Sequence, residues 1–198
     1  MTWKPYELDR IALQIVLNAK TRAESDAKSR AGKDKDPSAK KTSLGSLNQV
    51  YKMRAACAFG LERFWGEHLR LAHANDSTSE RQAKKSKDDS LKHRGDREKA
   101  MIIIDTWLAF VGIMKTAGID LPNTVVDLAK LFDDLDKGDA AQPEALKRDE
   151  INKVTQKLWN LTIMENQACL SVLTSFCDAI VWWTQRLKAG TADQEDAD

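Results

Sequence analysis

Residues 101–117 read MIIIDTWLAFVGIMKTA, and this stretch decides the fold. It is apolar on almost every face of a helix and is interrupted only by Asp105, Thr106, Lys115 and Thr116. A helix of this kind is typical of a protein core, because a surface helix keeps one polar face. The alternative is a membrane span, but a bilayer needs about 20 apolar residues and rejects a central acid. We therefore expect a core helix over 99–117 that is ended by Gly118.

Four further helices are predicted around this one, each indicated by apolar residues that recur every three or four positions. They cover residues 5–20, 43–74, 124–137 and 143–189, the last with a kink or phase shift at Glu165-Asn166-Gln167. Gly60 and Gly66 weaken the second of them, and we expect each to allow close approach of a neighbouring helix. No convincing strand pattern occurs. The prediction is an all-α bundle of about five helices in one domain over 1–198.

Two long polar tracts, about 20–42 and 75–98, separate these helices, and an acidic tail follows at 190–198. We expect mobile loops and a frayed tail, because these segments hold too few apolar residues to bury. Part of the second tract could be helical as an extension of the helix that follows it. Charge is also uneven: residues 1–99 carry 22 Lys and Arg against 14 Asp and Glu, net +8, whereas 100–198 are net −7. Such polarity favours a polyanionic partner, head-to-tail assembly, or mutual neutralisation of the halves on folding.

The basic tracts are the best indication of function. The side chains that could neutralise nucleic-acid phosphates are Lys33, Lys35, Lys40, Lys41, Lys84, Lys85, Lys87, Lys92, Arg94 and Arg97. Acids dilute the two tracts, and no Phe, Tyr or Trp interleaves them, so any contact should be independent of base sequence. The alternative is that both tracts are only solubilising loops.

The motifs of several chemistries are missing from the sequence. It contains no GxGxxG, Walker A, GxSxG or HExxH pattern. None of its histidines follows a carboxylate by three residues, as a helical di-iron site requires, and the acids of 133–139 do not fit an EF-hand. We expect Cys57, Cys169 and Cys177 to act as small buried hydrophobes. No metal or cofactor site is predicted.

One catalytic constellation remains, Arg63-Phe64-Trp65-Gly66-Glu67-His68. An Arg followed after four residues by His resembles the motif of HEPN-type ribonucleases, which are also all-α bundles. The resemblance implies that Arg63 positions a phosphate and that His68 is a general acid or base at the ribose hydroxyl or leaving oxygen. On a continuous helix the two side chains lie about 140° apart, so this site needs a break near Gly66. The other interpretation places His68 on the apolar seam, with Arg63 paired to Glu62 or Glu67.

Three further residues are notable for their place on a helix. Trp182 shares a face with Ser171, Ser175 and Asp178, which favours either a partner surface or packing at the edge of the core. Arg54 falls on an apolar stripe, where it should extend to solvent or pair with an acid. Asp105 lies in the most apolar helix, and we expect a hydrogen bond to a neighbouring helix rather than catalysis.

The sequence as a whole favours a non-catalytic helical subunit that assembles with a protein partner or with itself. Its basic half could also touch nucleic-acid backbone. The alternative function is a HEPN-like ribonuclease that uses Arg63 and His68. The amino terminus lacks a basic segment followed by an apolar run, so we expect no secretory signal and a cytoplasmic protein. We expect no cofactor and no membrane contact.

Overall fold

The computed structural model describes residues 7–31, 46–79, 87–123 and 143–189. These residues form helices and no strand, which confirms the all-α class. The α-helices are α1 (Leu8–Ala31), α3 (Gln49–Ala56), α4 (Leu61–Ser79), α5 (Lys87–Thr116), α7 (Pro143–Trp159) and α8 (Ile163–Ala189). Two short 3-10 helices, η1 (Ser46–Asn48) and η2 (Cys57–Phe59), flank α3. The predicted helix 124–137 and tail 190–198 lie outside the described residues.

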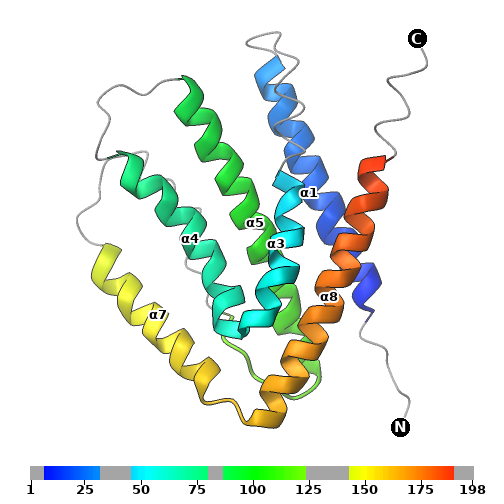
Figure 1. Ribbon diagram of the computed structural model, residues 1–198, viewed down its shortest axis with the longest axis vertical. Coiled ribbons are helices and arrows are strands. Elements are labelled where there is room, and N and C mark those ends of the chain that lie inside the picture. Colours follow the sequence, from blue (N-terminus) through cyan, green and yellow to red (C-terminus); the bar gives the residue numbers. More distant parts are fainter. Residues whose placement is uncertain (1–6, 32–45, 80–86, 124–142, 190–198) are drawn as a thin grey trace.

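The helices form two packed pairs that share α3. In Figure 1, α1 and α8 run upward beside each other, whereas α4 runs upward against the descending α5. The short helix α3 descends between these pairs and contacts both α5 and α8. α7 lies on the outer side of α4, at the left of the view, and turns into α8 at the lower end.

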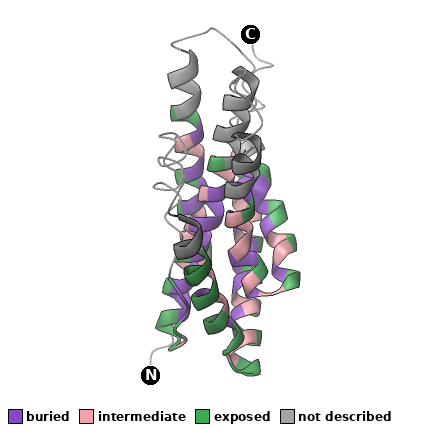
Figure 2. Ribbon diagram, turned by 90° about the vertical axis from the view of Figure 1, so that its left-hand side faces the viewer, coloured by how far each residue is buried: buried purple, intermediate pink, exposed green. Residues whose placement is uncertain are grey.

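The apolar part of α5 forms the centre of the core, as its composition predicts. Trp107 packs against Phe64 of α4 with ring centroids 6.2 Å apart, and against Phe110 at 5.7 Å. The Trp107 Nε1–H also donates a hydrogen bond of 3.0 Å to the Pro122 carbonyl, so its polar atom is satisfied. Figure 2 shows the buried residues of the helices facing one another across the bundle. One side of α5 still reaches solvent, because Leu108 is 42% exposed.

Gly118 ends this helix as predicted. Its φ of 82° lies in the left-handed region, where a residue with a side chain is strained. The Gly118 N–H donates to the Lys115 carbonyl at 3.1 Å, and the Ile119 N–H donates to the Met114 carbonyl at 3.0 Å. These two bonds are those of a Schellman C-cap, so the chain turns away from the helix axis at this glycine.

The predicted helix 43–74 is interrupted, and the role expected for its glycines was wrong. Gly60 has φ 107° and separates η2 from α4, because this backbone conformation cannot continue a right-handed helix. The nearest atoms to a Cβ at Gly60 would be those of the Glu62 carboxylate, in the following turn, and not those of a neighbouring helix. A Cβ at Gly66 would meet nothing within 4 Å. Neither glycine therefore serves a close approach between helices.

The predicted single helix 143–189 is also two helices. α7 ends at Trp159 and α8 begins at Ile163, so the break precedes the kink that we expected at Glu165-Asn166-Gln167. Glu165, one of these three polar residues, does shape the chain at this point, but it helps to start α8 rather than to bend a continuous helix. Glu165 accepts a hydrogen bond of 2.9 Å from the backbone N–H of Thr162, the residue before α8.

The polar tracts, about 20–42 and 75–98, are partly helical. This corrects the expectation of loops at 20–31 and 75–79, and it agrees with a helical extension in front of the core helix. α1 continues to Ala31, α4 continues to Ser79 and α5 already begins at Lys87. The extension of α1 is rich in Ala, Lys, Arg and Glu, which favour a helix. Lengthening a formed helix also costs far less than starting one. α1 is also fixed to α5 within its extension, since Ala23 is buried and Arg22 reaches Asp105.

Replacing Trp107 by Ala should lower the free energy of unfolding by about 3–5 kcal/mol, because it leaves a cavity and an unpaired Pro122 carbonyl. The matched change Leu108→Ala, on the exposed side of the same helix, should cost less than about 1 kcal/mol. Urea denaturation followed by circular dichroism measures both. Equal losses in the two variants would show that α5 is not the centre of the core.

Candidate functional site

The helix ends that flank the two basic tracts all lie in the upper half of the bundle in Figure 1. α1 ends there and η1 begins there, and likewise α4 ends and α5 begins there. Arg97 is exposed on α5, and Lys87, Lys92 and Arg94 belong to the first turns of that helix, where side chains are not described. Outside the described residues lie Lys33, Lys35, Lys40, Lys41, Lys84 and Lys85. The topology thus brings the flanks of both tracts to one end.

Two ion pairs between helices neutralise part of the charge difference between the two halves of the sequence. The Arg22 Nη2 donates to the Asp105 Oδ2 at 2.7 Å, between α1 and α5. Arg54 of α3 forms an ion pair with Asp178 of α8. Each pair joins the basic half of the sequence to the acidic half. Both confirm a prediction, since Asp105 bonds to a neighbouring helix and Arg54 pairs with an acid.

Arg63 and His68 do not meet in this structure. α4 is continuous from Leu61 to Ser79, so the break near Gly66 that the ribonuclease arrangement needs is not present. Arg63 is exposed, with its guanidinium 5.0 Å from the centroid of the Phe59 ring. His68 faces the core and is only 2% exposed, as the other interpretation expects. Glu67, one of the two acids expected to pair with Arg63, instead accepts a hydrogen bond from Arg70.

The buried imidazole of His68 is held in its neutral form. Its Nδ1–H donates to the Trp65 carbonyl, and its ring packs edge-on to the Trp65 ring at 5.1 Å. The Nε2 is buried and has no hydrogen-bond partner among the residues that the structure describes. Burial lowers the pKa of His68 to about 4, because the charged form would lose its hydration. At neutral pH this histidine is therefore a structural residue of the core.

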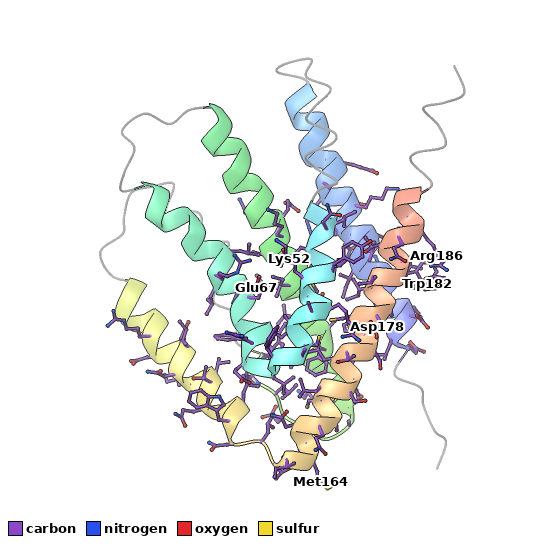
Figure 3. The ribbon with its side chains drawn as sticks, viewed as in Figure 1. Lys52, Glu67, Met164, Asp178, Trp182 and Arg186 are labelled. Carbon is purple, nitrogen blue, oxygen red and sulfur yellow. The ribbon has the colours of Figure 1, made fainter. Side chains whose placement is uncertain are left out.

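Trp182 is exposed on the outer side of α8, one turn beyond Asp178, as Figure 3 shows. The guanidinium of Arg186 lies 3.2 Å from the centroid of its ring and also donates to the Trp182 carbonyl. Trp183 meets the Trp182 ring edge-on at 4.6 Å. Arg186 thus already covers one face of the indole. A partner surface at Trp182 stays a prediction.

Among the described residues, the most exposed large apolar side chains lie elsewhere, at the junction of α7 and α8. They are not among the sites predicted from the sequence. Trp159 is 63% exposed, and Ile163 and Met164 are each 78% exposed. These three residues, called the α7–α8 corner below, fall within six positions of the chain. Figure 3 shows Met164 at the lower end of the molecule, away from the basic flanks.

A capping box fixes the shape of this corner. The Thr162 hydroxyl accepts the Glu165 N–H at 3.2 Å, while Glu165 accepts both the Thr162 N–H at 2.9 Å and the Thr162 hydroxyl at 2.7 Å. These hydrogen bonds from Thr162 lower the pKa of the Glu165 carboxyl below its ordinary value. Ile163 and Met164 stand between the two capping residues, in the first turn of α8. The corner therefore presents its apolar side chains from an ordered turn.

A sequence signal for this corner exists. Thr162-Ile163-Met164-Glu165 has the spacing of a capping box, which predicts a helix start with its two inner residues in the first turn. The apolar periodicity hides this helix start, because Val154, Leu158 and Leu161 continue the pattern of α7 up to the break. How far Ile163 and Met164 are exposed depends on what packs beside them, which only the tertiary structure shows.

The described residues contain neither a metal-site cluster nor a membrane-spanning helix. Within 7–31, 46–79, 87–123 and 143–189, no three His, Cys, Asp or Glu side chains gather as a metal site would need. None of the described helices is long and apolar enough to cross a bilayer.

The burial of His68 predicts a pH-dependent stability. As the pH falls from about 6.5 to about 4, the unfolded chain gains a proton at His68 and the folded chain does not, so stability is lost across this window. The loss should approach about 3 kcal/mol. The His68→Phe variant keeps an aromatic ring and should lack this slope. Urea denaturation at a series of pH values measures it, and identical slopes in the two proteins would contradict the assignment.

Comparison with protein-family models, with curated protein sequences and with solved structures finds no match for this chain. Its function is therefore inferred from the residues, charges and contacts of the chain itself.

Proposed function

We propose that this protein is a non-catalytic helical subunit that assembles with a protein partner or with itself through the α7–α8 corner. One observation carries the proposal: Trp159, Ile163 and Met164 are 63%, 78% and 78% exposed within six consecutive positions. Clustered large apolar side chains on a surface mark interaction sites far more often than single ones do. Trp is also the residue most enriched at the energetic centres of interfaces.

The rigidity of the corner supports the same function. The capping box of Thr162 and Glu165 orders the turn before any partner arrives, so less conformational entropy is lost on docking. Burying apolar surface contributes about 25 cal/mol per Å². In this proposal the three side chains of the corner form the centre of an interface, and the exposed Asn160 and Gln167 belong to its polar rim.

A second contact, with nucleic-acid backbone, is part of the proposal. The helix ends that flank both basic tracts lie at the end of the bundle opposite Met164 (Figures 1 and 3). A partner on the α7–α8 corner would therefore leave the basic end free. Flexible Lys and Arg side chains that meet phosphates recognise the backbone rather than the bases.

The ribonuclease alternative receives no such support, since Arg63 is exposed and His68 is buried on the continuous helix α4.

The double variant Ile163→Ser/Met164→Ser should release the protein from its native assembly. It removes two apolar side chains that each contribute about 1.5–3 kcal/mol when buried, and so weakens association about 100-fold or more. Ser is well tolerated in a first helical turn. Size-exclusion chromatography with light scattering, on tagged protein purified from its native source, gives the mass of the assembly and should show the 22.2 kDa monomer for this variant.

The matched control is Gln167→Ser/Ala168→Ser, which changes two exposed residues one turn further along α8. It should keep the mass of the wild-type assembly, and thermal melts should be alike for all three proteins. A wild-type protein that is itself monomeric, or a corner variant that stays in the assembly, would overturn the proposal.

Reversing Lys84, Lys85 and Lys87 to Glu should weaken binding to all oligonucleotides alike. The variant leaves up to three phosphates without a cationic partner, so the dependence of log affinity on log salt should become shallower by about 0.7–0.9 for each of these phosphates. Salt titrations of binding to two unrelated oligonucleotides measure both effects.

The control for this experiment is the reversal of Lys115, Lys153 and Lys157, which are exposed and change the net charge by the same amount. If the two triple variants bind equally, net charge alone explains the effect. Unchanged affinity in the Lys84, Lys85 and Lys87 variant, or strong discrimination between the oligonucleotides, would contradict a contact between the basic tracts and the nucleic-acid backbone.

A further inference from the structure

Two of the three cysteines meet in the core, between elements that are far apart in the sequence. The Cys57 Sγ at the end of α3 lies 3.7 Å from the Cys177 Sγ of α8, and the thiols share a hydrogen bond. The Met53 carbonyl, 3.4 Å from the Cys57 Sγ, is an alternative acceptor for the Cys57 proton. Cys57 is 5% exposed and Cys177 is 1% exposed, so both are shielded, although Cys57 less completely. Neither is in a disulfide.

The surroundings of the two sulfurs differ. The hydrogen bond with Cys177 and the nearby Arg54 guanidinium lower the pKa of the Cys57 thiol below its ordinary value. The same hydrogen bond and burial raise the pKa of the Cys177 thiol. Arg54 is held in place by its ion pair with Asp178, the residue after Cys177. Cys57 is thus the more acidic thiol of the pair.

We propose that Cys57 and Cys177 form a reversible disulfide under oxidation, and that this bond locks α3 to α8. The 3.7 Å separation of the two sulfurs and the Arg54 guanidinium near Cys57 together carry this inference, and Cys57 is the less deeply buried of the two cysteines. A metal site is the other common use of paired thiols, but zinc needs four ligands, and no third His, Cys, Asp or Glu joins the pair within the described part of the chain.

The oxidant in this proposal is hydrogen peroxide, a small molecule that takes two electrons from a thiolate. The Cys57 thiolate attacks one peroxide oxygen, an S–O bond forms as the O–O bond breaks, and the leaving hydroxide takes a proton to become water. The Cys177 sulfur then attacks Cys57, an S–S bond forms as the S–O bond breaks, and the second hydroxide leaves as water with the Cys177 proton. Two thiols and one peroxide give one disulfide and two waters. A dithiol reductant reverses the step by thiol–disulfide exchange.

The fold supplies the small movement that the bond requires. Two sulfurs 3.7 Å apart must approach to about 2.05 Å. Cys57 begins the short helix η2, and Gly60 follows it with φ 107°, so the chain beside this cysteine is a single turn that ends in a break. Cys177 lies within the long helix α8. We expect η2 to shift toward α8 rather than the reverse.

Cys169 provides an internal control. It is fully buried on the same helix as Cys177, and burial raises its pKa to about 11, so it should stay a thiol. The variants Cys57→Ser and Cys177→Ser each remove one partner, whereas Cys169→Ser removes a cysteine that the proposal does not use. Ser replaces sulfur by oxygen with little change of shape, and circular dichroism checks that each variant is folded.

The experiment treats the reduced full chain with hydrogen peroxide and follows intact mass, peptide cross-links and melting temperature. Wild type and Cys169→Ser should each lose two hydrogen atoms, link the Cys57 and Cys177 peptides, and melt about 5–15 °C higher until dithiothreitol is added. Cys177→Ser should instead accumulate a sulfenic acid at Cys57 that a carbon nucleophile traps. Cys57→Ser should not react.

The proposal is overturned by no reaction in the wild type, by over-oxidised Cys57 beside a free Cys177, by links between chains, or by any link that uses Cys169. A second pair of variants tests whether Cys57 is the sulfur that attacks the peroxide. Arg54→Gln should slow the peroxide reaction about three- to tenfold and move its rate–pH profile upward, because the thiolate loses a neighbouring cation. Lys52→Gln, on the same helix, should not. Equal rates in these two variants would overturn the assignment of Cys57.

Discussion

The rest of the structure depends on the need to cover the apolar part of α5. Ala100 to Met114 carries buried residues on several faces, and no single neighbouring helix could shield them all. α4 covers one side with Phe64, which packs on Trp107, and α1 and α3 contact α5 from other sides. Because α1 and α3 also pack on α8, the carboxyl-terminal helix is bound to the core by the same elements. The cross-helix pairs of Arg22 with Asp105 and of Arg54 with Asp178 then join the basic and acidic halves of the chain.

Periodicity predicts the class of this fold well, and it predicts the ends of the helices poorly. The core helix and its Gly118 stop follow from composition, because a nearly all-apolar helix has one stable place in a folded chain. Helix breaks depend on single residues that a long apolar pattern conceals. Gly60 stops a helix through its positive φ, and Thr162 starts one through a capping box, yet apolar residues continue on both sides of each. The polar extensions of α1 and α4 show the opposite error, since a helix already fixed by packing continues through residues with no apolar face.

The candidate sites were predictable to different degrees for similar reasons. Partners for Arg54 and Asp105 could be expected, because a charge on an apolar stripe must be paired, but their identity needed the topology. The α7–α8 corner and the Cys57–Cys177 pair could not be found from spacing. The corner is a surface site because no neighbouring helix covers Ile163 and Met164, and spacing does not show this. The two cysteines are separated by 119 residues in the sequence, and only the fold brings them into contact. Arg63 and His68 show the converse, since a short motif suggested a proximity that the continuous helix α4 does not provide.

The central claim is that the α7–α8 corner is an interface in the functional protein. Hydrogen–deuterium exchange tests it most directly, because the backbone amides of Ile163 and Met164 lie in the first turn of α8, where a helix supplies no partner for its N–H groups. These amides should exchange rapidly in the isolated chain. In the assembly purified from the native source, the peptides that span 159–166 should exchange at least about tenfold more slowly, while the exposed side of α5 around Leu108 should be unchanged. Equal exchange of 159–166 in the free and the native protein would contradict the account.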